Sequence, residues 1–172
     1  MKWCVYILCI IFFSNCVSLK QTKQTGIKKV ENLNSFNGTY ENLSNTERPY
    51  SSLWNQLRLT DSYTSDNGEA KVELIVINKN QIRAILTQNN QIKSELILKG
   101  KLRDNYFVSN SRRTIIPIPF IYGDIKNNQF QLALGESNSL LVDRLNNQWG
   151  WVFFFLASND QTKHNAYKTI EK

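Results

Sequence analysis

Three consecutive runs in which every second residue is mostly apolar constrain the fold of this chain most strongly. The runs are 72–77, 82–87 and 92–99, and the polar connectors between them are Asn78-Lys79-Asn80 and Gln88-Asn89-Asn90. Alternation with a period of two is typical of a strand with one buried face, and connectors of this length join neighbouring antiparallel strands. The middle of the chain therefore predicts a β-meander.

The strand pattern continues toward the C-terminus. Further runs are 106–109, 114–121, 129–134, 140–145 and 149–157, and 165–171 suits either a closing strand beside 36–41 or an amphipathic helix. Pro117 and Pro119 cannot donate ladder hydrogen bonds, so their strand should be an edge, a bulge or a rim crossing. The stretch 149–156 is apolar on both faces, and we expect both faces to be covered within the domain.

Helical periodicity is almost absent, which favours a closed antiparallel barrel of about 8–10 strands over a sandwich. One short helix is expected at 51–58, where Ser51 and Ser52 can cap a turn. Its apolar residues Leu53, Trp54 and Leu57 share one face, so it would be either a lid across the barrel end or a plug that completes the core.

Gly38-Thr39-Tyr40 is similar to the first-strand signature of the lipocalins, Gly-x-Trp, with Tyr40 in place of Trp. The second motif of that family, a Thr-Asp-Tyr-like turn, is absent from the expected region. The resemblance implies an all-β, up-and-down, lipocalin-like (calycin) barrel. A glycine that eases a bent first strand beside a packed tyrosine is the alternative interpretation.

The N-terminus has the order of an export signal. Lys2 precedes an apolar run over 3–13, and Ser14-Asn15-Cys16 follows. The run is shorter than the roughly 20 residues of a membrane-spanning helix. Residues 17–34 are polar and predict a flexible tether, which leaves one domain at 35–172.

Phe13-Ser14-Asn15-Cys16 resembles a loose bacterial lipobox, with Phe13 where Leu is usual and Asn15 where a small residue is usual. Together with a composition rich in Asn, Lys and Ile, it is similar to lipoproteins of the Bacteroidetes group. The resemblance implies cleavage before Cys16 and attachment of a fatty acyl anchor such as palmitate there. All three cysteines lie in this segment, so acylation would account for the odd one. Ordinary cleavage near Cys16-Val17-Ser18, which gives a secreted soluble barrel, is the alternative.

The inventory of catalytic and metal-binding residues is thin. His164 is the only histidine, in a polar stretch without a nucleophile motif, and no cluster has metal-ligand spacing. The net charge of +7 is scattered rather than arranged as a nucleic-acid stripe. We therefore expect no enzyme activity, no cofactor, no metal and no nucleic-acid partner. Carboxylates considered and set aside are Asp61, Asp66 and Glu69 for calcium and Glu73 with Glu95 for glycoside hydrolysis.

The function expected from the sequence is that of a lipid-anchored, non-enzymatic envelope protein facing the periplasm or the cell surface. A small apolar ligand or lipid would bind in the barrel, with Trp54, Phe107, Trp151 and Phe153 as its lining. Protein–protein interaction of an assembly or immunity type, through loops around Arg112-Arg113 and Tyr122, is the alternative. An enzyme is the third hypothesis and would need a buried carboxylate with a shifted pKa in a cleft.

Overall fold

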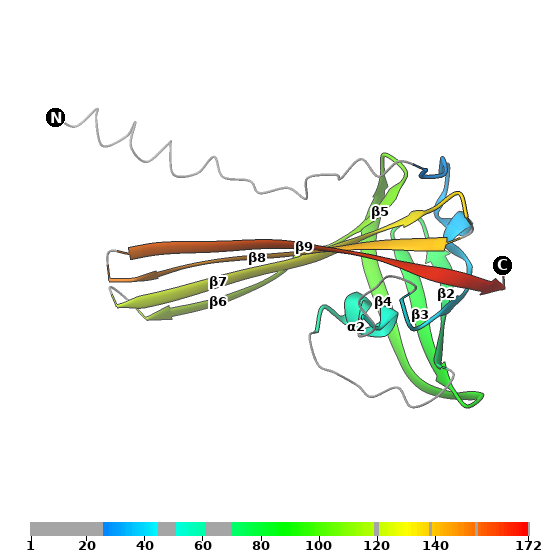
Figure 1. Cartoon of the computed structure of the whole chain (residues 1–172), viewed down its shortest axis with the longest axis horizontal. Helices are drawn as coiled ribbons and strands as arrows, with labels where there is room; N and C mark the ends of the chain where they lie inside the picture. Colours follow the sequence, from blue (N-terminus) through cyan, green and yellow to red (C-terminus); the bar gives the residue numbers. More distant parts are fainter. Residues whose placement is uncertain are drawn as a thin grey trace.

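The computed structural model describes residues 26–44, 51–60, 70–118, 121–137, 139–153 and 155–171. It confirms the all-β barrel: eight antiparallel strands close on themselves and a ninth pairs outside the closed part (Figure 1). The elements in chain order are η1 (Leu33–Phe36), β1 (Gly38–Glu41), α2 (Leu53–Arg58), β2 (Ala70–Asn78), β3 (Gln81–Gln88), β4 (Gln91–Arg103), β5 (Tyr106–Ser109), β6 (Arg112–Ile118), β7 (Tyr122–Leu134), β8 (Ser139–Val152) and β9 (Phe155–Glu171).

Two seams close the barrel. At one seam β1 pairs with β9, with Tyr40 opposite Thr169, so the C-terminal segment is the closing strand rather than a helix. At the other seam β5 pairs with β7, with Phe107 opposite Leu132. Each of these strands thus finds a partner on both sides within the barrel, which removes exposed sheet edges there.

The short helix α2 is a plug. Leu53, Trp54 and Leu57 are buried in the same cluster as the inward side chains of the strands. The Ser52 hydroxyl caps the helix by accepting from the amide of Asn55, at 3.2 Å. The side chain of Asn42 then accepts from the Trp54 amide at 2.9 Å, which ties the start of the helix to the end of β1.

The folded body includes residues before the expected boundary at residue 35. Val30 and Leu33 are buried in the core cluster, and η1 begins at Leu33. The Val30 amide donates to the side chain of Asn105, in the turn between β4 and β5. The last part of the segment predicted as a tether is therefore packed on the barrel, while residues 17–25 lie outside the described ranges.

The outer halves of four strands leave the barrel together as an arm (Figure 1). The arm comprises residues 112–118, 121–128, 146–153 and 155–161, in the order β6-β7-β8-β9. β7 changes partner where the arm begins: residues 131–132 pair with β5, and residues 122–128 pair with β6. β6 is an edge strand, as Pro117 predicted; Pro119 lies outside the described residues.

The prediction of one covered strand over 149–157 is wrong. β8 ends at Val152 and β9 begins at Phe155, so the stretch forms the end of a hairpin. Phe155 and Leu156 are 80% and 78% exposed, which contradicts coverage within the domain. The turn contains Phe153 at φ 52°, a left-handed conformation that glycine or asparagine normally supplies. No residue that favours turns stands at this reversal, so the apolar run gave no sign of the hairpin in the sequence.

Candidate functional site

The four residues predicted to line a ligand site do not come together. Trp54 and Phe107 belong to the buried core cluster inside the barrel, whereas Trp151 and Phe153 lie on the arm. Within the described part of the chain, the inward side chains form one continuous apolar cluster. A small-molecule site in the interior would therefore compete with core packing.

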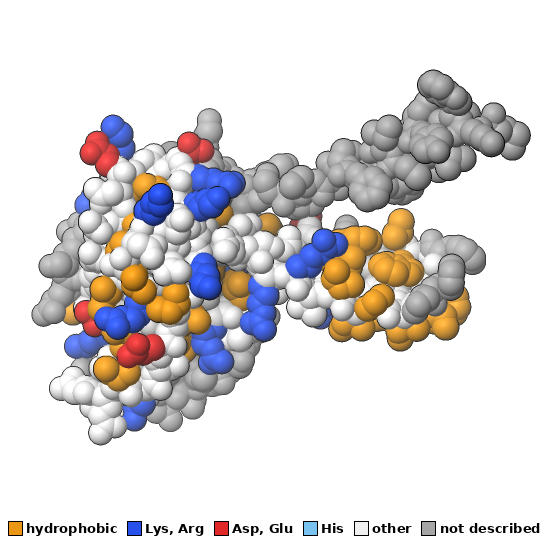
Figure 2. Space-filling model, turned by 180° about the vertical axis from the view of Figure 1, so that it is seen from behind, with side chains coloured by type: hydrophobic (Ala, Val, Ile, Leu, Met, Phe, Trp, Pro, Cys, Tyr) orange, Lys and Arg blue, Asp and Glu red, His pale blue; other side chains and the backbone are white. Residues whose placement is uncertain are grey.

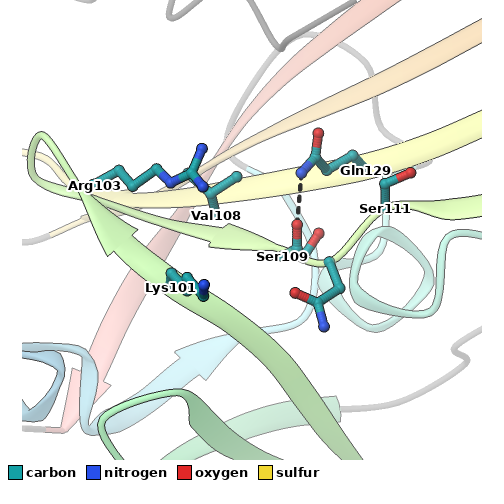
Figure 3. Close-up of a pocket in the computed structure, with 7 residues that line it drawn as sticks. Lys101, Arg103, Val108, Ser109, Ser111 and Gln129 are labelled. Carbon is teal, nitrogen blue, oxygen red and sulfur yellow. Dashed lines mark hydrogen bonds between the residues drawn. The ribbon is translucent and has the colours of Figure 1, made fainter. Parts of the chain in front are cut away.

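A polar hollow of about 270 Å³ marks the place where the arm leaves the barrel (Figure 3). Lys101 and Arg103 of β4 face it from one side, and Gln129 of β7 lies on the other. The Gln129 side chain donates to the carbonyl of Ser109 at 2.6 Å, and the Ser109 hydroxyl accepts from the Phe130 amide at 2.9 Å. These two hydrogen bonds hold the chain in place where β5 ends and β6 begins. We therefore interpret the hollow as a result of this change of strand and not as a ligand site.

A second hollow, of about 390 Å³, is open and lies between η1 and the turn that joins β2 to β3. Its walls include Leu33, Val76 and Leu102 together with Glu31 and Lys79. Its size falls in the range of about 300–1,000 Å³ of small-molecule sites, but such sites usually enclose their ligand. This hollow is a surface groove.

His164 takes part in a cross-strand network that the sequence did not reveal. Its Nδ1 lies 2.6 Å from Oδ1 of Asp143, and the other oxygen of that carboxylate accepts from Gln131 at 2.9 Å. The Asp143 side chain is 2% exposed. The pKa of Tyr106 is raised, first by burial of its own hydroxyl and second by the negative charge of Asp143. A His–Asp pair can orient an imidazole for proton transfer. Here the row Gln131–Asp143–His164 joins β7, β8 and β9.

The other acidic residues named in the sequence analysis do not form a site in the described part of the structure. Glu73 and Glu95 are exposed, and each lies opposite Ile85 of the strand between them, on the outside of the barrel. Asp61, Asp66 and Glu69 lie outside the described residues. No group of three or more His, Cys, Asp or Glu side chains suited to a metal ion occurs in the part of the chain that the structure describes.

The end of the arm is the largest concentration of exposed apolar side chains on the described molecule. We call residues 115–118, 121–125, 149–153 and 155–157 the tip. Figure 2 shows hydrophobic side chains gathered there, with Lys and Arg side chains between them and the barrel. The exposed large apolar residues of the tip are Ile115, Ile116, Ile118, Ile121, Trp149, Val152, Phe153, Phe155 and Leu156.

Aromatic side chains lie on one face of the tip, and a charged side chain lies on the other. The Trp149 and Trp151 rings lie 6.0 Å apart, and Trp151 lies over Gly123, where any Cβ would clash with the ring. On the opposite face, Asp124 accepts from the side chain of Gln148 at 3.0 Å and lies 3.4 Å from the ammonium of Lys126. The one carboxylate within the tip is therefore bonded to Gln148 and paired with Lys126.

The residues expected to contact a protein partner also lie on the arm. Arg112 and Arg113 are exposed on β6, directly behind the tip, and Tyr122 begins β7 within it. Register places Arg113 beside Asn127 and Asn147, so a polar row separates the tip from the barrel.

The export signal and Cys16 lie outside the described residues. Among the helices in the described ranges, none combines the length and the apolar character needed to cross a bilayer. No known protein family, curated protein or solved structure matches this chain.

Proposed function

We propose that this chain is an exported, lipid-anchored envelope protein that acts by binding rather than by catalysis, with the arm as its binding element. The observation that carries the proposal is the exposed apolar tip, held away from the barrel by four hydrogen-bonded strands. Soluble proteins rarely leave such a patch uncovered, and a patch of this kind marks an interaction site. The residues first expected at a protein interface, Arg112, Arg113 and Tyr122, belong to the same arm.

A closed barrel is also compatible with a small apolar ligand, which was the first expectation from the sequence. The fully buried Phe107 and the nearly buried Trp54 instead take part in core packing. Two of the four expected lining residues, Trp151 and Phe153, belong to the arm. We therefore place binding on the arm and give the barrel the role of a rigid support.

The anchor is tested by replacing Cys16. In a bacterial host, the wild-type chain should be recovered in the membrane fraction. Its intact mass should equal that of a chain that starts at Cys16 and carries acyl groups. Cys16→Ser should lose the acyl mass. Cys9→Ser is the matched control, because Cys9 lies in the segment that is removed, and it should remain anchored. An unprocessed wild-type chain without acyl groups would contradict the proposal.

A further inference from the structure

We propose that the tip of the arm inserts into one leaflet of a lipid bilayer that carries anionic headgroups. This inference rests on the proposed function, in which the arm is the binding element, and it adds the partner. Three features of the tip lead to it: apolar side chains on both faces, a short apolar length, and a boundary of aromatic and basic residues.

Both faces of the tip are apolar. Residues paired across antiparallel strands share a face, so the register places Ile115 with Trp149 on one face and Ile118 with Val152 on the other. Phe155, opposite Val152, extends the second face and is the most exposed large apolar side chain of the tip. A protein partner normally covers one face of a sheet, whereas lipid surrounds both faces and the end. The distribution of apolar residues therefore favours lipid.

The apolar length suits shallow insertion. From the row of Ile115 to the row of Ile118 there are four residues, which span about 10 Å at about 3.3 Å per residue. Interfacial elements bury their apolar side chains about 5–10 Å into the boundary of headgroups and acyl chains. A membrane-spanning strand needs about 9–11 residues. The tip therefore reaches the acyl region of one leaflet and does not cross the bilayer.

The open edges of the arm set the same limit. Among the residues that the structure describes, β6 pairs with β7 alone, and the part of β9 in the arm pairs with β8 alone. Unpaired backbone groups are costly in hydrocarbon, which disfavours deep insertion of an open sheet. Pro117 removes one donor from the β6 edge within the tip. Shallow insertion leaves the other edge groups close to headgroup water.

The boundary of the tip resembles that of proteins at a membrane surface. Trp149 is partly exposed at the inner end of the apolar rows, and tryptophan prefers the level of the headgroups. Behind it lie Arg112 and Arg113, both exposed on β6. Basic residues at this position attract anionic lipids by charge complementarity. The lipid chemistry that fits is therefore an anionic leaflet.

The native tryptophans allow a direct test. The acylated wild-type chain is reconstituted into vesicles of phosphatidylcholine and phosphatidylglycerol, part of whose acyl chains carry bromine near the headgroup. Bromine quenches only tryptophans that lie within contact distance, so Trp149 and Trp151 should be quenched and blue-shifted. Trp54, in the core, should be unaffected. Most of the emission should therefore be lost in brominated vesicles.

Two double variants separate insertion from anchoring. Phe155→Asp with Leu156→Asp introduces two charges where the native side chains are largely exposed. This variant should lose the tryptophan quenching, while the chain still floats with the vesicles. Ile77→Asp with Ile92→Asp is the matched control, because these residues are 50% and 64% exposed but lie on the barrel. This control should keep wild-type quenching. Arg112→Gln with Arg113→Gln, or vesicles of pure phosphatidylcholine, should weaken it.

Each other outcome contradicts a different statement. A wild-type chain that floats with unquenched tryptophans overturns insertion and leaves the anchor in place; if light scattering then shows a dimer that the Asp variant loses, the tip binds a second copy. Failure of the wild-type chain to float overturns the anchor and the insertion together. Equal quenching in neutral and anionic vesicles overturns the preference for anionic lipid.

Discussion

Replacing Phe107 by alanine is expected to lower the free energy of unfolding by about 3–5 kcal/mol, the usual effect of deleting a buried phenylalanine ring. The Phe107 side chain is fully buried, and its ring centroid lies 6.5 Å from that of Phe130. It also lies over Gly100, where a Cβ would come within 2.7 Å of the ring. Neighbours held this closely by the strands cannot collapse into the space, so a cavity would remain.

The position of Phe107 adds to this effect. It lies opposite Leu132 at the seam between β5 and β7, which closes the barrel. Urea unfolding followed by circular dichroism measures the change, with an unchanged slope as the sign of a two-state loss of stability. Phe155→Ala removes the same ring from the arm tip and should change stability by less than about 0.5 kcal/mol. Equal losses for the two variants would mean that the tip is covered in solution.

The barrel could be predicted because its sequence signals are local. The runs that became β2, β3 and β4 place apolar residues at most alternate positions, and the connector between β3 and β4 contains Asn89 and Asn90, which both adopt the positive φ that tight hairpins need. The cap at Ser52 and the apolar face of α2 were visible in the same way. Local pattern and global fold agree in these segments, which is the condition under which such reasoning succeeds.

The arm escaped prediction because its polar rows resemble turns. Asn127, Asn147 and Asp160 belong to residue types that favour turns, but in the structure they lie side by side across three strands. There they pair with one another, and the side chain of Asn147 donates to Asp160. Strands β7, β8 and β9 consequently run well beyond the predicted segments. A polar connector between strands and a polar row across a sheet exposed on both faces have the same composition, so the sequence alone does not distinguish them.

The candidate site depended on tertiary placement. The apolar stretch that contains Trp149 and Leu156 was recognised, but whether other residues cover it depends on where the strands project. His164 and Asp143 are 21 residues apart, and only the register of β8 and β9 brings them to 2.6 Å. Neither relation follows from periodicity, since periodicity gives the face of a residue and not what lies opposite that face.

The second large expected effect is a loss of stability between pH 10 and pH 12, caused by two buried tyrosines. Burial raises the pKa of Tyr40 to about 12, and it raises the pKa of Tyr167 further still. Both hydroxyls donate to backbone carbonyls, Tyr40 to Phe36 at 2.9 Å and Tyr167 to Ser51 at 3.1 Å. An exposed tyrosine in the unfolded chain loses its proton at a pH of about 10.

The sign of the effect follows from proton binding. Above pH 10 the unfolded chain releases protons that the folded chain retains, so rising pH favours unfolding. The contribution of these tyrosines is complete below pH 10 and declines as the pH approaches the folded value. For Tyr40, a difference of two pKa units corresponds to about 3 kcal/mol. Urea titrations at several values between pH 8 and pH 12 should therefore show a progressive fall in the free energy of unfolding.

Tyr40→Phe separates this titration from simple loss of a contact. The variant should be about 1 kcal/mol less stable at pH 8, because the hydrogen bond to Phe36 is lost, yet it should lose less stability on going to pH 12. Leu132→Val is the matched control: it removes buried apolar volume and no titratable group, so the full alkaline loss should remain. If Tyr40→Phe and the wild-type chain lost equal stability above pH 10, the Tyr40 hydroxyl would have to ionise in the folded barrel as readily as in the unfolded chain.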